Sequence, residues 1–294
     1  MPFGLRHLVA LLSVGLRACW AQRSAPVVVG QTFLAGGLDP TCDCSDPWAL
    51  TSHGVSEKLF TVDANGDIVG QVAQSVTKVP CSTIHCEQLG SEFAWDVTIK
   101  SDIKFSDGTT VTAAHVAAAL TELNTQNAAA QSSLGTMTMA ARHWDARGCR
   151  SNCHRALDAQ TVRIQSTSPT HAMDSVLAEW PFVVYYKDAA EAVYYTGPYA
   201  VASHSDSQID LVPNEHYSGG TERPLVQLKK FAGGQALAEA AQRNQLDIGF
   251  HLPTDMVAEV QAVPGQSVVS FETGYHNMMV STATVAPAIF QRGR

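Results

Sequence analysis

The chain has 294 residues, of which 45% are hydrophobic and 16% are charged, so it can bury a large core and wholesale disorder is excluded. It contains 19 Lys and Arg against 27 Asp and Glu, a formal net charge of -8. This acidic balance repels phosphate backbones and argues against a nucleic-acid partner.

The N-terminus carries a short membrane-like stretch. Arg6 precedes an apolar run over residues 8–16, and small residues follow between Ala18 and Ala21. The run is too short to span a bilayer, but its length and flanks are typical of a secretory signal peptide. We therefore predict a cleaved signal peptide over residues 1–21 and a periplasmic or secreted (extracytoplasmic) protein.

Six cysteines follow the predicted leader, in three close pairs: Cys42 and Cys44, Cys81 and Cys86, Cys149 and Cys153. In an oxidising compartment they predict up to three disulfides, whose connectivity the spacing leaves open. We expect no bond between Cys42 and Cys44, because bridge geometry fits poorly across one intervening residue. A zinc site is the alternative, because His85 and His154 lie beside cysteines.

The first half of the chain predicts strands separated by turns, followed by a helix. Residues 26–30 form an apolar run typical of a buried strand, and Asn65-Gly66 indicates a hairpin. Residues 93–100 alternate apolar and polar side chains, as in a half-buried strand. A helix is predicted over residues 113–123, capped by Thr112 and ended by Asn124.

The second half alternates strands and helices. Residues 137–159 show no regular period and predict a loop insertion. Strands are predicted at 161–164, 199–201, 209–212, 226–231 and 246–250, and helices at 173–180 and 235–244. This order favours a mixed α/β fold.

Several of these segments carry a family resemblance. Phe93–Lys100, the turn Lys104–Thr109 and the helix start Thr112–Val116 stand in the same order as in the extracellular solute-binding proteins of peptide, opine and nickel ABC importers (family 5). Thr196–Tyr199, Val212–Tyr217 and Gln245–Gly249 resemble further landmarks of that family. The similarity extends over about residues 28–279.

The resemblance implies a periplasmic-binding-protein-like (type II) bilobal fold, represented mainly by the first lobe and its small subdomain. We expect residues 22–56 to start lobe 1, 57–188 to form an inserted subdomain, and 189–272 to complete the lobe. Residues 273–294 would begin the crossing towards a second lobe that is largely missing. The stretches 80–90 and 142–155 interrupt the family pattern.

The function that this resemblance implies is binding without catalysis. We expect the chain to hold a short peptide, or a small amino-acid-like or nickel chelate, and to deliver it to an ABC transporter permease. The permease is then its only link to the membrane, and no cofactor is required. The sequence contains no nucleophile elbow, no HExxH and no P-loop.

Six residues at the junctions of predicted elements are candidate ligand contacts: Trp48, His53, Trp180, Phe182, Tyr275 and His276. Aromatic walls with a few polar groups suit a small amphipathic ligand. For Trp48 and Trp180 the alternative is a role as core anchors, and for His53 a hydrogen bond to the backbone. His276 lies beside Met278 and Met279, which also fits either a soft metal or core methionines.

Two other functional classes stay open at this point. One is a metal-dependent hydrolase that uses a cysteine and histidine set: Cys81, His85, Cys86, Cys149, Cys153 and His154. The other is a sensory or interaction module that kept the lobe fold and lost transport.

Overall fold

The computed structural model describes residues 25–80, 93–134, 155–166, 171–220, 222–250 and 252–269. The chain divides into two compact units, one up to Leu252 and one from Pro253 onwards. The predicted signal peptide and the predicted crossing segment 273–294 lie outside the described residues. Among the helices described, none combines the length and the apolar character needed to cross a membrane.

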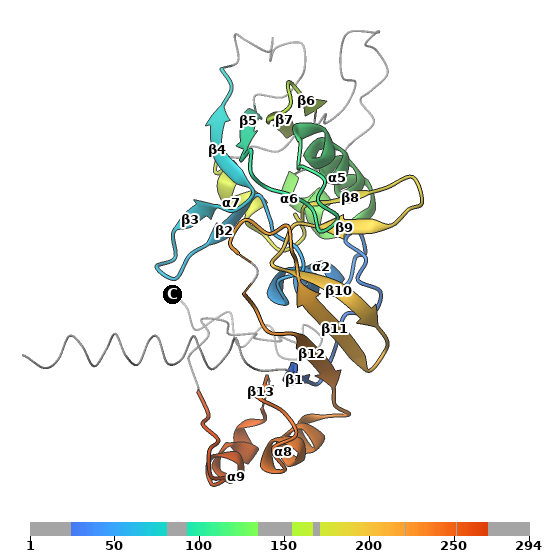
Figure 1. Ribbon diagram of the computed structural model, residues 1–294. Helices are drawn as coiled ribbons and strands as arrows, with labels where there is room; N and C mark the ends of the chain where they lie inside the picture. Colours follow the sequence, from blue (N-terminus) through green and yellow to red (C-terminus); the bar gives the residue numbers. More distant parts are fainter. Residues whose placement is uncertain are drawn as a thin grey trace, which may run out of the picture. The chain divides into compact units, whose positions relative to one another are not determined.

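A five-stranded mixed sheet organises the first unit (Figure 1). Its strand β1 (Val27–Gln31) lies between β12 (Val226–Lys230) and β13 (Ile248–Gly249) and is parallel to both. The hairpin of β10 (Tyr199–His204) and β11 (Gln208–Pro213) extends the sheet antiparallel beyond β12. All five strands include segments that the sequence predicted.

The helix α8 (Gly234–Gln242) connects β12 to β13, as parallel pairing requires. Its contact with β1 depends on Gly30, since a Cβ there would lie 2.6 Å from a methyl carbon of Leu237 and 2.9 Å from one of Leu246. The absence of a side chain at Gly30 therefore allows α8 to pack closely on the strand that leads to the candidate site.

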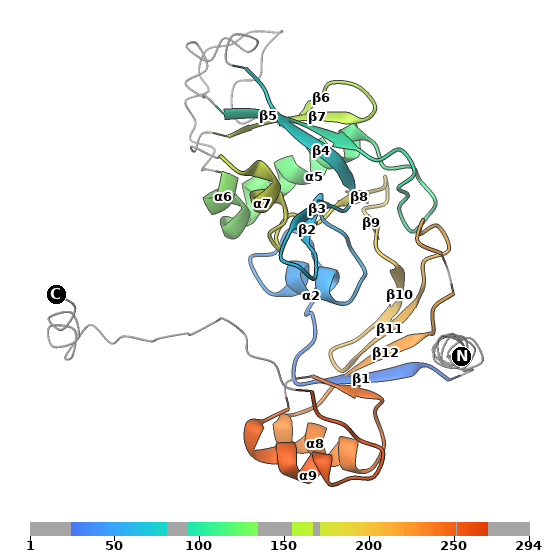
Figure 2. The same ribbon diagram turned by 90° about the vertical axis from the view of Figure 1, so that its left-hand side faces the viewer.

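A second, antiparallel sheet contains β4 (Ala73–Lys78), β5 (Phe93–Ile99), β7 (Thr161–Ser166) and β6 (Arg155–Ala156), in that order. Its central strand β5 is the one that alternation of apolar and polar residues predicted. The helix α5 (Ala113–Gln126) packs against β6 and β7 (Figure 2). The loop insertion predicted over residues 137–159 is wrong at residues 155 and 156, because these two residues form β6 and pair with β7.

The cap of α5 is Thr112, as predicted. Its hydroxyl accepts the backbone N–H of His115 at 3.4 Å, and its own N–H donates to His115 Nδ1 at 3.3 Å. The predicted end at Asn124 is wrong, because the helix continues to Gln126 and Asn124 lies inside it, 1% exposed. Asn127 ends α5, and its side-chain oxygen accepts the N–H of Ala130 at the start of α6 (Ala128–Leu134).

Two hairpins complete this unit. Strands β2 (Phe60–Val62) and β3 (Ile68–Gly70) form the hairpin predicted around Asn65-Gly66, where Gly66 takes the positive φ of 87°. Strands β8 (Tyr185–Lys187) and β9 (Val193–Tyr195) form a hairpin that the sequence did not predict.

The short helices depart most from expectation. The helix α2 (Asp46–Ser52) was not predicted. The helix α7 (Met173–Leu177) ends before the predicted Trp180, and Pro181 disfavours helical conformation in the residue before it. The second unit contains η1 (Thr254–Met256) and α9 (Val257–Gln261).

One hydrophobic core runs through the first unit and draws side chains from both sheets and their helices. Among its fully buried members are Leu50, Leu59, Phe105, Leu123, Ile164, Leu177 and Phe182. This continuous core fixes the loop after β1 relative to the rest of the unit.

A disulfide joins Cys42 and Cys44 in the turn before α2. Our expectation that this pair would not close on itself is wrong, because the turn brings the two Cα atoms to 5.2 Å. That separation lies within the usual disulfide range of roughly 4.4–6.8 Å. The other two cysteine pairs lie outside the described residues.

Candidate ligand-binding site

The carboxyl end of β1 is the first place to look for a ligand site. The backbone N–H of Phe250 donates to Gly30 O at 2.9 Å, and that of Phe231 donates to Gln31 O at 2.8 Å, so the three parallel strands end together. Ligands of open α/β sheets bind beyond the carboxyl ends of such strands. The residues that follow β1 and those on α2 are therefore the candidates.

A buried glutamine and a histidine meet at this edge. Gln31 is only 2% exposed, and its Nε2 lies 2.8 Å from Nε2 of His53, the residue that ends α2. Burial lowers the pKa of His53 to about 4, so the ring is neutral at pH 7. With Gln31 donating to Nε2, the neutral ring carries its proton on Nδ1 and has one donor left.

An aromatic pair lies in the same part of the chain. The rings of Phe33, in the loop after β1, and Trp48, on α2, have centroids 5.6 Å apart and are tilted by 36°. Trp48 remains 38% exposed, although most large apolar side chains of this unit are buried. An exposed tryptophan offers apolar area and an indole N–H donor to a ligand.

Asp46 fixes the loop that connects these groups. Its carboxylate accepts the backbone N–H groups of Gly36 at 2.7 Å, Gly37 at 2.8 Å and Asp39 at 3.1 Å. Asp46 is also the first residue of α2, two positions before Trp48. The three bonds therefore tie the helix that carries Trp48 to the loop that leaves β1.

A cavity of about 440 Å³ lies beside this loop. It is lined by Gly37 and Leu38 of the loop, by Val55 and Ser106, and by strand residues of β9 and β10, namely Val193, Tyr194, Tyr195, Tyr199, Ala200 and Val201. The hydroxyl of Tyr195 donates to Leu38 O at 2.7 Å and so holds one wall in place. The cavity falls within the size range of small-molecule sites.

Glu57 is a buried acid in the same unit, 5% exposed. Its Oε1 accepts the hydroxyl of Tyr217 at 3.2 Å, while Oε2 has no hydrogen-bond partner within the described part of the chain. Burial, opposed by the bond from Tyr217 and by the charge of Lys100, raises the pKa of Glu57 to about 7. The protein therefore holds a carboxyl group that changes charge near neutral pH.

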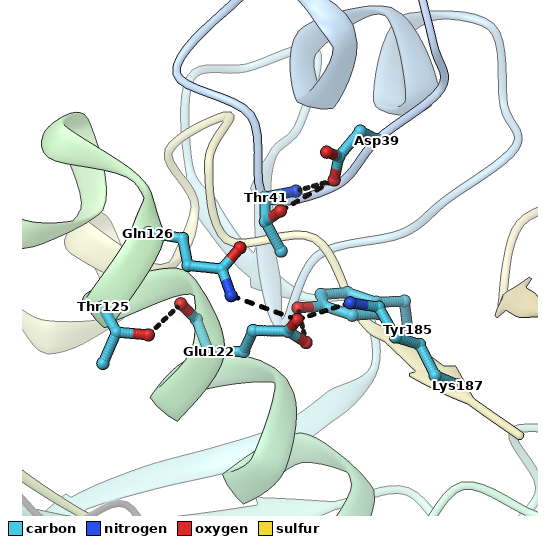
Figure 3. Close-up of polar contacts among 7 residues, drawn as sticks. All are labelled: Asp39, Thr41, Glu122, Thr125, Gln126, Tyr185 and Lys187. Carbon is cyan, nitrogen blue, oxygen red and sulfur yellow. Dashed lines mark hydrogen bonds and ion pairs between the residues drawn. The ribbon is translucent and has the colours of Figure 1, made fainter. Parts of the chain in front are cut away.

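A polar cluster on α5 and β8 has a structural explanation (Figure 3). Glu122 accepts the hydroxyl of Tyr185 at 2.8 Å and forms an ion pair with Lys187. Burial and the Glu122 carboxylate both raise the pKa of Tyr185, which stays protonated. Because the charges of Glu122 and Lys187 are paired, this cluster fastens the helix to the hairpin.

Of the six predicted contacts, Trp48 and His53 lie on one short helix, α2, and at its end. Trp180 and Phe182 lie on another segment, after α7, where Trp180 is 36% exposed and Phe182 is 1% exposed within the core. Tyr275 and His276 lie outside the described residues.

The sequence reasoning missed Gln31 and Phe33. Gln31 ends an apolar run, and a polar residue at the end of a buried strand is the signal that could have indicated it. The six residues of the hydrolase alternative, Cys81, His85, Cys86, Cys149, Cys153 and His154, lie outside the described ranges.

Comparison with protein families gives one match. The model described as "Bacterial extracellular solute-binding proteins, family 5 Middle" matches residues 68–288. A search of curated proteins found no match.

Solved structures of binding proteins share the fold. The nickel ABC transporter protein of Bacillus halodurans superposes with a TM-score of 0.60 at 20% identity, covering 80% of this chain and 45% of that one. The murein tripeptide binding protein MppA of Escherichia coli gives 0.64 at 20% identity, with coverages of 82% and 49%. The agropinic acid complex of AgaA from A. tumefaciens R10 gives 0.64 at 18% identity, with coverages of 82% and 46%. The chain thus has the mixed α/β architecture of periplasmic binding proteins and spans about half the length of these structures.

Proposed function

This chain belongs to the bacterial extracellular solute-binding proteins, family 5, and from that premise we propose that it binds a short peptide or a small amino-acid-like or nickel chelate outside the cytoplasm. It then delivers this solute unchanged to the permease of an ABC importer. The observation that carries the proposal is the exposed ring of Trp48 together with the half-buried imidazole of His53 beyond the carboxyl end of β1.

The ligand class follows from the solutes of the similar structures. These structures include a complex with nickel and two histidine molecules, a murein tripeptide binding protein and a complex with agropinic acid. The peptide and the nickel–histidine chelate both carry amino-acid-like polar groups. We therefore assign this chemistry, rather than a lipid or a nucleotide, to the present chain.

The site contacts suit such a solute. The Trp48 ring supplies apolar area, and the Nδ1–H of neutral His53 donates to a carbonyl or carboxylate oxygen of the ligand. Trp180, Tyr275 and His276 remain proposed contacts. Phe182, which is 1% exposed, would contact the ligand only if the core opened around it.

We also propose that residues 22–56 and 189–272 form one lobe, with 57–188 inserted as its subdomain. The support is the five-stranded sheet, in which β1 pairs with β12 and β13 although about 200 residues separate them in the chain. In the complete fold a second lobe closes over the ligand, and the permease distinguishes the closed from the open form.

The experiment is a thermal-shift and calorimetric screen of the pure chain against di- and tripeptides, amino acids and nickel–histidine mixtures. A ligand at 100 times its Kd stabilises the folded state by about 2.7 kcal/mol, which gives a measurable rise in melting temperature. If no member of the three classes raises that temperature, the chain does not bind as proposed.

Two substitutions at the proposed site and one control substitution elsewhere test whether the solute binds at Trp48 and His53. Trp48→Ala is expected to weaken binding about thirtyfold and His53→Ala about tenfold, the effects of losing an aromatic contact and a hydrogen bond. Leu157→Ala removes a comparably exposed apolar side chain (40% against 38%) from another part of the unit and should leave the Kd unchanged. Equal losses in all three variants would contradict the assigned site.

The delivery step has its own measurement. Proteoliposomes that contain the candidate ABC permease are expected to take up the labelled solute faster when the chain is added. Conversion of the solute into another compound by the pure chain would contradict a binding function without catalysis.

A further inference from the structure

The turn between β1 and α2 gathers three groups that are ligands for metal ions. The sulfur atoms of Cys42 and Cys44 and a carboxylate oxygen of Asp46 all lie within 4.8 Å of one another. Cys44 is exposed, Cys42 is half-buried and Asp46 is buried. These are ligand types that zinc and other thiophilic cations accept.

Contacts other than the disulfide hold this turn, and one of them reaches a sulfur ligand, because the backbone N–H of Asp46 donates to Cys44 Sγ at 3.4 Å. The Asp46 carboxylate is oriented by the N–H groups of Gly36, Gly37 and Asp39. The side-chain amide of Asn127 donates to Cys42 O at 2.8 Å, which ties the turn to the end of α5. Such supporting bonds orient metal ligands and raise the affinity of a site.

In the structure the two sulfur atoms are bonded to each other, and a disulfide offers no thiolate to a metal. The bond encloses one residue, Asp43, so it closes a very short loop and contributes little to the stability of the chain. Because Cys44 is exposed, an external thiolate can reach the bond. This disulfide therefore suits opening and closing more than it suits fastening the fold.

We propose that Cys42, Cys44 and Asp46 form a redox-controlled site for a thiophilic divalent cation, closed as the disulfide and open as the dithiol. The reductant is an external dithiol. One of its thiolates attacks Cys44 and releases the Cys42 thiolate, and its second thiol then displaces Cys44 from the mixed disulfide. The dithiol leaves as a disulfide, and two electrons and two protons pass to the protein.

The reduced site binds its cation through both sulfur atoms and one oxygen of Asp46, and the two thiol protons are released to solvent. Three protein ligands leave a fourth position of a tetrahedral zinc site for water or another donor. The site does not depend on the proposed transport function, because none of its three ligands is a proposed contact of the transported solute.

The test uses the full chain with every other cysteine replaced by serine, so that only Cys42 and Cys44 remain. It is reduced with dithiothreitol, desalted under nitrogen and titrated with zinc against a chromophoric chelator. We expect one bound zinc per chain after reduction and none in the oxidised protein. Removal of both sulfur ligands, by Cys42→Ser with Cys44→Ser, should abolish binding. Equal zinc retention by this double variant, or none by the reduced chain, would overturn the proposal.

The role of Asp46 needs a separate readout, because Asp46→Asn also disturbs the loop that its carboxylate holds. If the variant folds, it should bind zinc at least about tenfold more weakly, while Asp43→Asn, which changes the neighbouring exposed charge, should bind as the parent does. X-ray absorption of the zinc-loaded parent provides the independent measurement. Two sulfur ligands with oxygen ligands are expected, and an all-sulfur or all-oxygen shell would contradict the site.

Discussion

The two sheets of the first unit differ in how far their polar groups are paired and their aromatic side chains are buried. On the antiparallel sheet, Arg163 of β7 donates two hydrogen bonds of 2.7 Å to Asp96 of β5, and Phe105 beside α5 is fully buried. At the carboxyl end of β1, in contrast, Trp48 is 38% exposed and Phe250 is 51% exposed. Polar groups paired within the fold stabilise it, whereas the exposed ring of Trp48 offers apolar area to a ligand. Substitutions in the first region should therefore change stability, and those in the second should change binding.

Phe105→Ala should give the largest change in stability. The side chain is 0% exposed. The centroid of its ring lies 4.6 Å from the ring centroid of Tyr186 and 5.3 Å from that of His115. Its removal leaves a cavity and should lower the free energy of unfolding by about 3–5 kcal/mol. Urea unfolding measures this loss, and Phe105→Leu, which fills most of the space, is the control. A loss below about 1 kcal/mol would show that the region is not packed as described.

Glu57→Gln should change how stability depends on pH. The pKa of Glu57 is about 7 in the folded state against 4.5 for the ordinary group, so the folded protein binds the proton more tightly. Stability from this group is therefore complete below pH 4.5 and is lost as pH rises through 7, by about 3 kcal/mol in all. Glutamine cannot ionise and still accepts the bond from Tyr217.

The measurement is urea unfolding of both proteins at pH 5 and pH 8. The Gln variant should be the more stable one at pH 8, by up to about 3 kcal/mol, and similar to the parent at pH 5. Glu215→Gln, at an exposed carboxylate, is the matched control and should change neither value. If the parent instead became more stable relative to the Gln variant as the pH rises, the pH dependence would have the opposite sign. The assignment of Glu57 as a buried acid with a raised pKa would then be wrong.

The sequence predicted the parts of this fold in which one physical signal dominates. Strand β5 alternates apolar and polar residues from Trp95 to Ile99, and the Asn65-Gly66 turn requires the positive φ that glycine allows. Thr112 stands directly before the apolar stripe of α5, and such a position is a recognisable cap. These local signals need no knowledge of the tertiary structure.

The remaining elements depend on contacts that are distant in the chain. Helix α2 has seven residues and is held by the bonds of Asp46 to the preceding loop, which no periodic pattern reveals. Gln31 becomes a site residue only because His53, 22 positions later, lies within 2.8 Å of it. Trp48 and His53 were predicted as candidates, but their neighbours Gln31 and Phe33 required the structure.

Thr112→Ala should have a moderate effect on the antiparallel region. The Thr112 hydroxyl accepts the N–H of His115, and its loss leaves the first turn of α5 without this cap. We expect the free energy of unfolding to fall by about 1 kcal/mol. Thr112→Ser retains the hydroxyl and is the control in the same urea titration. If both variants lose equally, the methyl group rather than the cap is responsible.

Trp48→Ala should have the smallest effect on stability and so gives the sharpest contrast with Phe105→Ala. The side chain is exposed over more than a third of its area, and its replacement should change the free energy of unfolding by about 0.5 kcal/mol. The same variant is expected to show the largest loss of ligand affinity, because the exposed ring is the apolar surface offered to the solute. Unfolding and calorimetry on one preparation measure both quantities. A large loss of stability with unchanged affinity would make Trp48 a core anchor and would move the binding site away from the end of β1.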